Sequence, residues 1–373
     1  MLGGETMNRI FLTGTTARTL RRLARHERGV TLERSSIDAI EPPSRSRSAP
    51  NRLDLARLRS FLSVSGTHGI ELLVPTPKDR IRARGITCHV QSKPLPSGSF
   101  LRLVRNETGD ASDPPSDTEV FVESPCLAVL SAARQLGKLV SQQVMSSTEA
   151  DLRLFKLAME DCSTYALDPI HPMDKDCLYG IEPVLTKQDL DSYLHDANAI
   201  IGLQRAAKVA EWLVGRSASP METFLCAGYS LPPSSGGLGF PQPKLNHTIH
   251  LSHMKQLMLN HTERLTPDLL WEAWSVLIEY LGAESHEGDG AQDEDMGRIQ
   301  DFEVLGYRPF PVRYRHVKTP TSFNRLAARV ATAMESQGAQ GIRAWVDELV
   351  SYKDFLATQL LLFKVMLPPV WSR

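Results

Sequence analysis

The stretch PDLLWEAWSVLIEYLG, residues 267–282, sets an acidic residue near the start of one short apolar run and another late in the next. Such runs predict two buried strands joined by a tight turn. If the chain turns at Ala273 and Trp274, paired residues have numbers that add to 547, and Asp268 lies opposite Glu279. Opposed side chains have Cβ atoms roughly 5 Å apart, where like charges are unfavourable. The pairing therefore calls for a raised pKa, a basic partner or a metal ion.

The bulk composition limits the classes of function. A chain of 373 residues predicts two or three domains. The net charge of −1 argues against a strongly basic coat over the whole protein, so any basic surface for nucleic acid is local. Five scattered cysteines without CxxC spacing indicate free thiols in a reducing cytoplasm. Neither a signal-peptide core nor an apolar stretch of ~20 residues is present, which predicts a cytoplasmic protein without a membrane partner.

The pattern of strands and helices predicts an α/β (α+β) protein with four ranges. Residues 1–50 are expected to form a basic amino-terminal helix and a linker, and residues 51–210 a mixed α/β region. Residues 211–320 read as helix, strand, hairpin, helix and strand, which predicts a small α/β unit. Residues 321–373 are expected to form carboxyl-terminal helices.

Several residues of the small unit carry oxygen or nitrogen groups suited to one chemistry. A helix glutamate, Glu222, placed against Asp268 and Glu279 would make an all-oxygen site for Mg²⁺ or Mn²⁺. Such an ion activates water and stabilises charge on a scissile phosphate. His286 is the candidate general base, and Arg298 is suited to a bidentate contact with a phosphate oxygen.

Each of these residues also has an ordinary structural role open to it. Glu222 can complete a capping box with Ser219 at the start of its helix. Asp268 can cap a turn, and Glu279 can simply pair with Arg298. The remaining alternatives are a helix-surface ion pair between Asp295 and Arg298 and a solvated loop position for His286.

The segment RPFPVRYRHVKT, residues 308–319, is predicted to be a strand on which basic and aromatic residues alternate. Arg313, Arg315 and Lys318 are its candidate contacts to a DNA backbone. The alternative is an exposed edge strand that its charges protect from pairing with another chain.

Three stretches, RSASPMETFLCAGYSLPPSSGGLGFPQPKLN, DLLWEAWSVLIEYLGAESH and DMGRIQDFEVLGY, resemble in their order the motifs of the very-short-patch-repair (Vsr-like) endonucleases of the PD-(D/E)XK superfamily. The match spans residues 215–318. It implies a restriction-endonuclease-like domain with a central mixed sheet flanked by helices, which cleaves DNA with Mg²⁺ or Mn²⁺. It further implies Glu222 as the helix acid, Asp268 as the metal-binding aspartate and Glu279 as the second strand acid, with His286 and Arg298 in accessory positions.

One departure from the superfamily pattern affects the expected activity. The pattern has a polar or lysine side chain two residues after the glutamate, whereas this chain has Leu281, on the same face of the strand as Glu279. Residues 8–145 are similar to the front half of abortive-infection antitoxin (AbiEi-like) proteins, which implies a setting in phage defence or a toxin–antitoxin-like system. We therefore expect a metal-dependent DNA endonuclease, or alternatively a DNA-binding regulator that keeps the nuclease fold with little or no cleavage.

Overall fold

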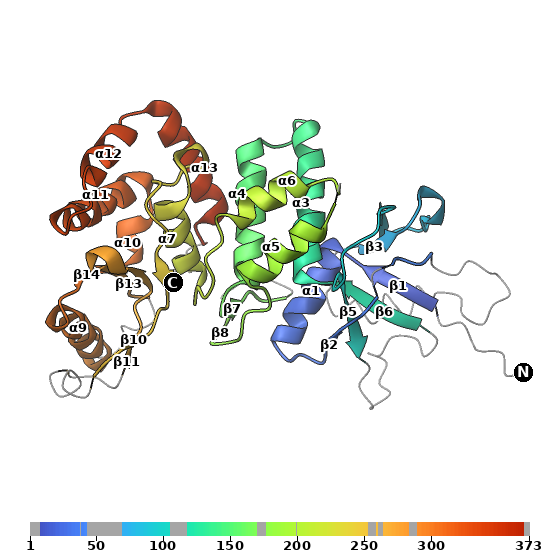
Figure 1. Cartoon of the computed structure of the whole chain (residues 1–373), viewed down its shortest axis with the longest axis horizontal. Coiled ribbons are helices and arrows are strands. Elements are labelled where there is room, and N and C mark those ends of the chain that lie inside the picture. The colour runs from blue at the N-terminus through green and yellow to red at the C-terminus, as the bar shows by residue number, and fades with distance from the viewer. Residues whose placement is uncertain are drawn as a thin grey trace, which may run out of the picture. The chain divides into compact units, whose positions relative to one another are not determined.

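The computed structural model of this chain describes residues 8–37, 39–42, 69–104, 118–169, 177–198, 200–252, 259, 264–282 and 289–368. The chain divides into two compact units, one of residues 1–142 and 166–210 and the other of residues 143–165 and 211–373. Each unit combines helices with a mixed sheet, so the predicted α/β class is confirmed at this level (Figure 1).

Unit 1 is built on a six-stranded sheet among its described residues. Its order is β2-β5-β6-β1-β3-β4, in which β1 runs parallel to β6 and antiparallel to β3. The strands are β1 (Asn8–Leu12), β2 (Thr31–Arg34), β3 (Ile70–Val74), β4 (Ile86–Val90), β5 (Phe100–Val104) and β6 (Thr118–Glu123).

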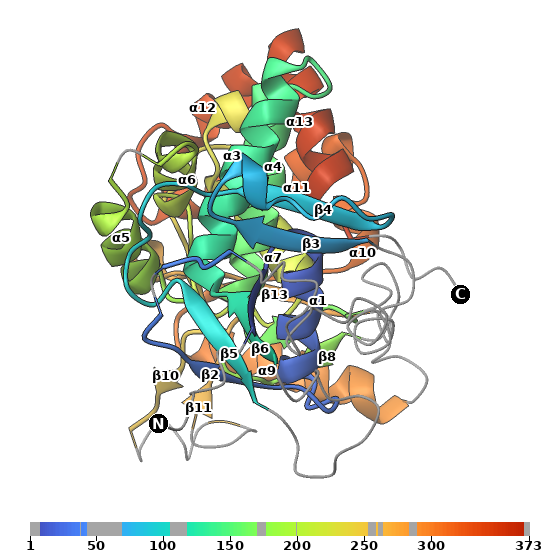
Figure 2. The ribbon, with the colours of Figure 1, turned by 90° about the vertical axis from the view of Figure 1, so that its right-hand side faces the viewer.

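The two faces of β1 show how this sheet is buried. Ile10 and Leu12 belong to a core cluster with Leu20 and Leu23 of helix α1 (Gly14–Arg25), which lies along the sheet in Figure 2. Phe11, between them, points to the other face and stacks on Phe121. Because consecutive side chains of a strand point to opposite faces, this all-apolar run fits a strand that is covered on both sides.

The remaining elements of unit 1 are mainly helical. Helix α3 (Pro125–Ser141) begins after Ser124, which is its N-cap and accepts a hydrogen bond from the Leu127 amide, and Pro125 lies in the first turn. The others are the 3₁₀ turn η2 (Pro77–Asp79), strand β8 (Leu178–Tyr179), helix α5 (Lys187–Asp196) and helix α6 (Leu203–Ala210), while strand β7 (Tyr165–Ala166) spans the boundary between the units.

Unit 2 contains a four-stranded mixed sheet of order β14-β13-β12-β9. Strand β13 (Val276–Tyr280) runs antiparallel to β12 (Leu269–Trp271) and parallel to β14 (Arg308–Val312), and β9 (Lys244–Leu245) completes the sheet. Helix α7 (Pro220–Ser230) precedes the sheet, and α9 (Asp289–Val304) lies between β13 and β14 in the sequence. This is the predicted order of helix, strand, hairpin, helix and strand, with a further pair, β10 (Ile249–His250) and β11 (Arg264–Leu265), before the hairpin.

Further helices of unit 2 enclose α7 in an aromatic core. Phe224 of α7 packs edge-to-face on Phe323 of α11 (Pro320–Ser336) and Phe363 of α13 (Lys353–Met366). Gly228 of α7 allows this approach, because a Cβ there would lie 2.6 Å from the Phe323 ring. The other elements are α4 (Ser147–Asp161), η3 (Pro233–Ser235), η4 (Glu272–Trp274), α10 (Tyr314–Val317) and α12 (Ile342–Leu349).

The observed units differ from the four expected ranges. Residues 8–34 are not a separate basic element, because β1 and β2 are strands of the unit 1 sheet. Residues 321–373 belong to unit 2, where α11 and α13 pack against α7, and so does α4 from the expected middle region. The linker expected before residue 51 falls largely outside the described residues.

The expected strand over residues 308–319 is shorter than predicted. Strand β14 ends at Val312, and the chain then forms the short helix α10. Pro309 and Pro311 fit β14 because it is an edge strand of the sheet, and a proline has no N–H for a second neighbour.

In the part of the chain that the structure describes, we find no helix with the length and hydropathy needed to cross a bilayer.

Candidate functional site

The hairpin of unit 2 has the register that the sequence predicts. Leu269 pairs with Ile278 and Leu270 with Leu277, so the paired numbers add to 547. The chain reverses through η4, after which Ser275 takes a left-handed conformation with φ of 51°. Continued by one pair, this register sets Asp268 opposite Glu279.

Both carboxylates line one pocket, of about 260 Å³. The hairpin provides Asp268, Glu279 and Leu281, and helix α9 provides Asp295, Arg298 and Ile299. Two strand acids and a helix cation thus meet at one concave surface. This is the kind of polar pocket in which pKa values are displaced.

Asp268 is held by the strand that it faces. Its Oδ2 accepts a hydrogen bond of 2.6 Å from the Tyr280 amide, and its carbonyl accepts one from the Asn246 amide. Loss of solvent raises the pKa of Asp268 well above its ordinary value, and the charges of Glu279 and Glu222 raise it further. The Tyr280 amide and Arg298 oppose this shift without cancelling it.

Glu279 is more deeply buried, with 5% of its surface exposed. Loss of solvent raises the pKa of Glu279 to about 7. Arg298 opposes the rise, because its Nη2 lies 3.1 Å from Oε2 of Glu279. The same guanidinium group donates a 2.5 Å hydrogen bond to the Thr266 carbonyl, which fixes it beside the hairpin. The ion pair that we gave as an alternative role for Glu279 is therefore present.

Glu222 has its oxygens occupied by neighbours. Ser219, the N-cap of α7, donates to Oε1, while the Ala218 amide and Nδ2 of Asn246 donate to Oε2 at 2.7 and 2.6 Å. In return, the Glu222 amide donates to Oγ of Ser219, so Ser219 caps the helix. The expected capping box is incomplete, because the Glu222 carboxylate bonds the Ala218 amide and the Ser219 hydroxyl instead of the Ser219 amide. Burial raises the pKa of Glu222, and these three donors lower it in part.

The expected three-carboxylate ion site is not preformed. Glu222 is close enough to act on the charge of Asp268. Yet among the described residues no group of three or more His, Cys, Asp or Glu side chains is arranged to hold a metal ion. His286 lies outside the described residues. Oδ2 of Asp295 is buried at the same pocket as Asp268 and Glu279, and it has no hydrogen-bond partner among the described residues.

Leu281 takes the place that the strand pattern predicts. It lines the same pocket as Glu279, and its amide donates to the Val312 carbonyl of β14. A leucine side chain offers neither a proton nor a ligand. The wall next to Glu279 is therefore apolar where the superfamily pattern has a polar group.

The other basic candidates cluster away from this pocket. Arg313 precedes α10, Arg315 lies on it and Lys318 follows it, whereas the pocket wall contains only Arg298 among the four predicted contacts. Burial lowers the pKa of His316 on α10, and the charges of Arg315, Arg329 and Arg313 lower it further. These arginines therefore form a local basic cluster around α10.

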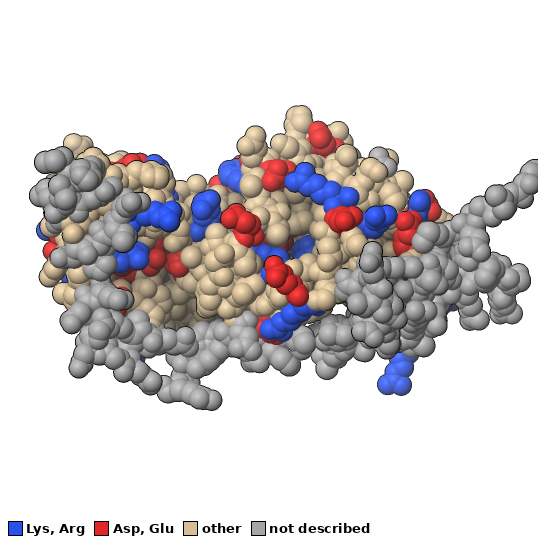
Figure 3. Space-filling model, turned by 90° about the horizontal axis from the view of Figure 1, so that it is seen from below, with Lys and Arg blue, Asp and Glu red and all other residues tan. Residues whose placement is uncertain are grey.

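On the face shown in Figure 3, basic and acidic side chains are interspersed, in keeping with the near-zero net charge.

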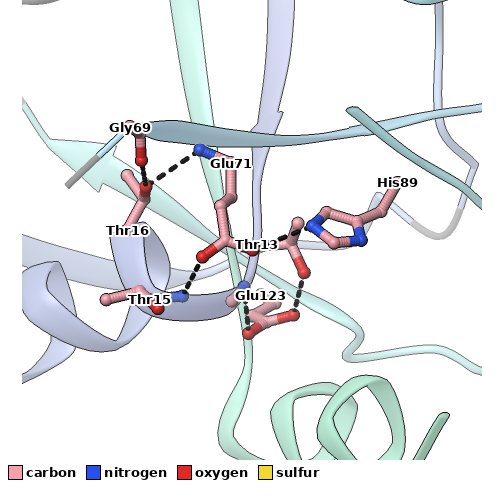
Figure 4. A network of polar contacts seen from close by, with 8 residues as sticks. Thr13, Thr15, Thr16, Gly69, Glu71, His89 and Glu123 are labelled. Carbon is pink, nitrogen blue, oxygen red and sulfur yellow. Dashed lines mark hydrogen bonds and ion pairs between the residues drawn. The ribbon is translucent and has the colours of Figure 1, made fainter. Parts of the chain in front are cut away.

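The structure also brings together polar residues in unit 1 that the sequence analysis did not single out (Figure 4). Two carboxylates meet the start of α1: Glu123 accepts from Oγ1 of Thr13 and from the Gly14 amide, and Glu71 accepts from the Thr15 amide. His89 lies 2.8 Å from the second oxygen of Glu71. Burial raises the pKa of Glu123, which is 2% exposed. These carboxylates satisfy amides at a helix start that would otherwise lack partners.

The wider comparisons add no relative. No protein-family model, curated protein or solved structure matches this chain. Its function is therefore argued from the pocket of unit 2 itself.

Proposed function

We propose that this protein hydrolyses phosphodiester bonds of DNA with a divalent cation held in the unit 2 pocket. The observation that carries the proposal is the presence of Asp268 and Glu279 in one pocket, both with raised pKa values. Two neighbouring buried acids are costly to ionise, so they do not stabilise the fold by themselves. A bound cation can replace their protons and neutralise the two carboxylates. The order of α7, the mixed sheet and α9 supports assignment of unit 2 to the PD-(D/E)XK superfamily.

The side chains present fit such an ion in their chemistry. Mg²⁺ and Mn²⁺ prefer oxygen ligands, and Asp268 and Glu279 would provide them. The buried Oδ2 of Asp295, which has no partner among the residues that the structure describes, offers a further acceptor at the pocket. Glu222 would act through its charge on Asp268 rather than as a ligand, because neighbouring donors occupy its oxygens. When bound, the cation would acidify a water molecule and neutralise charge on the phosphate.

The chain's own groups would position the reacting atoms. The Tyr280 amide orients the Asp268 carboxylate, and Asn246 orients Glu222. Arg298 lines the pocket, its side chain is 41% exposed, and its guanidinium group is suited to a phosphate oxygen. We keep His286 as the proposed proton acceptor and the basic cluster around α10 as the proposed contact to the DNA backbone.

A second function is favoured by the wall of the same pocket. Leu281 supplies no polar group beside Glu279, and Arg298 already forms an ion pair with that glutamate. Both features suit a DNA-binding regulator that retains the nuclease fold without efficient cleavage. The AbiEi-like pattern of the front half is consistent with this alternative and with a role in phage defence.

The two proposals separate in a paired experiment on the full chain. Mn²⁺ binding is measured by calorimetry and nicking of supercoiled plasmid by gel, for the wild type, Asp268→Asn and Asp347→Asn. Asp347 is the matched control because it pairs with Arg343 on the surface of α12, outside the pocket. The nuclease proposal expects Mn²⁺ binding and nicking that Asp268→Asn abolishes and Asp347→Asn leaves intact. DNA binding without nicking supports the regulator. Retention of both Mn²⁺ binding and nicking in Asp268→Asn would exclude the metal site.

A further inference from the structure

The described residues that line the unit 2 pocket include three acidic side chains and one basic one. Arg298 of α9 shares the wall with Asp268, Glu279 and Asp295. Its Nη2 lies 3.1 Å from Oε2 of Glu279 and 3.4 Å from Oε1, so it faces both oxygens of that carboxylate. In the proposed function these are the oxygens that would hold the cation. Arg298 and the cation therefore compete for the same carboxylate.

The tertiary fold, and not helix α9 alone, brings Arg298 to Glu279. Asp295 is closer in the sequence, one turn earlier on α9, yet its buried Oδ2 has no hydrogen-bond partner among the described residues. Nη2 of Arg298 instead donates to the Thr266 carbonyl at 2.5 Å as well as to Glu279. The guanidinium carbon also lies 5.9 Å from the centre of the buried Phe302 ring, a distance at which a cation and an aromatic face attract. These contacts hold Arg298 on the glutamate.

The guanidinium group of Arg298 keeps donors for another anion. Its side chain is partly exposed, whereas that of Glu279 is buried. Nη1 makes no hydrogen bond with any described residue, and the buried Nε makes none with them either. A guanidinium group binds two oxygens of one phosphate through paired N–H groups, so a phosphodiester can compete with Glu279 for it. Asp295 is three residues earlier on the same helix, a spacing at which its open oxygen can accept from Arg298 once that side chain turns from Glu279.

We propose that Arg298 gates the cation site of unit 2, binding Glu279 until a phosphodiester draws it away. The inference rests on the proposed function of this pocket. While Arg298 is on Glu279, a divalent cation meets a positive charge beside it and lacks one of its two carboxylates. Once Arg298 binds the phosphate, its charge is neutralised and Glu279 becomes available as a ligand. The cation is thereby bound most tightly together with the bond that it helps to hydrolyse. Because such coupling is reciprocal, the cation also strengthens phosphodiester binding by the same factor.

Mn²⁺ affinity, which needs no cleavage to be measured, tests this gate on the full-length protein. Calorimetric titrations with MnCl₂ are run with and without about 20 mM dimethyl phosphate, a small phosphodiester in excess of the millimolar Kd of a weak contact, at matched ionic strength. In the wild type we expect the diester to tighten Mn²⁺ binding about fivefold or more, the lower end of the usual coupling between two ligands. In Arg298→Gln we expect Mn²⁺ alone to bind about fivefold more tightly than in the wild type, and the diester to add less than about twofold, because the gate is already removed.

Two further variants separate the gate from a general effect of charge. Arg343 pairs with Asp347 on α12, outside the pocket, so Arg343→Gln should leave Mn²⁺ affinity unchanged. Arg298→Lys restores a positive charge and should bring both Mn²⁺ affinity and the effect of the diester back towards the wild type. Equal gains in Arg298→Gln and Arg343→Gln, or Arg298→Lys that binds Mn²⁺ as tightly as Arg298→Gln, would overturn the gate.

The outcomes distinguish failure of the gate from failure of the proposed function. If Mn²⁺ binds but the diester does not tighten it in the wild type, the gate is excluded while the metal site stands, and this comparison requires no variant to fold. If the diester tightens Mn²⁺ binding as strongly in Arg298→Gln as in the wild type, the phosphate acts on the ion directly and the gate is again excluded. If Mn²⁺ binds to neither protein under either condition, the metal site and the gate fail together.

Discussion

Arg298 and Glu279 form an ion pair between α9 and β13 in which one partner is open to water and the other is not. The side chain of Arg298 is 41% exposed and that of Glu279 is 6% exposed. Because the guanidinium group is partly hydrated, its attraction is too weak to offset the loss of solvent around the glutamate, and the pKa of Glu279 stays near 7. The unit 2 pocket therefore changes charge close to neutral pH.

The first prediction concerns the pH dependence of stability. In the folded chain Glu279 binds its proton more tightly than in the unfolded chain, so the free energy of unfolding falls as pH rises from about 4.5 through 7. Asp268 and Glu222, whose pKa values are also raised, add to the same slope. We expect unit 2 to lose roughly 1–3 kcal/mol between pH 5 and pH 8, measured by urea unfolding followed through tryptophan fluorescence.

Two variants check this assignment. Glu279→Gln removes the titrating group and should flatten the slope, whereas Asp347→Asn on the surface of α12 should leave it unchanged. An equally steep slope in Glu279→Gln would show that the group responsible lies elsewhere.

The second prediction links protons to cations. Protons and Mn²⁺ compete for the same carboxylates, so Mn²⁺ should stabilise the protein more at pH 8 than at pH 6. With 1 mM MnCl₂ at pH 8 we expect the melting temperature to rise by a few degrees, which is the shift that a ligand causes at a concentration of about 10–100 times its Kd. At pH 6 we expect a much smaller rise. A rise that is equal at both pH values, or that persists in Asp268→Asn, contradicts a site on these acids.

The third prediction addresses the hydrogen bond between Asn246 and Glu222. Nδ2 of Asn246 donates to the Glu222 carboxylate and to the Arg216 carbonyl. Asn246→Asp has the same shape but replaces these donors with a second anion, so it should cost about 2 kcal/mol at pH 8. At pH 5 the two carboxyl groups can share a proton, and the cost should fall by half or more. Asn246→Gly, which tolerates the left-handed backbone at φ of 46°, controls for conformation. A cost that does not change with pH would argue against a direct contact.

The fourth prediction uses Leu281. If unit 2 is a nuclease weakened by its apolar wall, Leu281→Lys places an amine beside Glu279 and should raise plasmid nicking at least about tenfold, because a well-positioned acid–base group contributes roughly 10²–10⁴-fold. Leu281→Met keeps an apolar side chain and should leave the rate unchanged. No gain in Leu281→Lys, with Mn²⁺ binding intact, would favour the DNA-binding regulator.

The hairpin could be predicted from sequence because its information is local. Eleven positions separate Asp268 from Glu279, and a tight turn between the two apolar runs fixes which of their residues pair. The cap of α7 is local in the same way, since Ser219 and Glu222 are three residues apart. The structure shows the Ser219 cap, but the Glu222 carboxylate bonds the Ala218 amide and the Ser219 hydroxyl, so the capping box is not completed.

The contacts that the sequence did not predict join distant segments. Glu123 is 110 residues from Thr13, and Asn246 is 24 residues from Glu222. No periodicity links such positions, although the left-handed residue at Asn246 follows the PKL run in one of the quoted motifs. Strand β14 ended early because Arg313 begins the turn of α10, and the alternating basic and aromatic residues of that segment fit either structure.

The final prediction concerns the start of α1 in unit 1. Gly14 has φ of 60°, and a Cβ there would lie 2.4 Å from Oε2 of Glu71. Gly14→Ala therefore both strains the backbone and displaces a carboxylate that accepts from the Thr15 amide and contacts His89. Gly29→Ala is the matched control, because Gly29 also has a positive φ, of 68°, but a Cβ there meets no atom within 4 Å. We expect Gly29→Ala to cost about 1 kcal/mol, which is the backbone strain alone, and Gly14→Ala about 2–4 kcal/mol by urea unfolding.

The difference between the two variants measures the contact with Glu71, and it should shrink when Glu71→Ala is combined with Gly14→Ala, because the displaced group is then absent. Equal costs for the two glycines would show that the Glu71 carboxylate moves aside freely and does not hold the start of this helix.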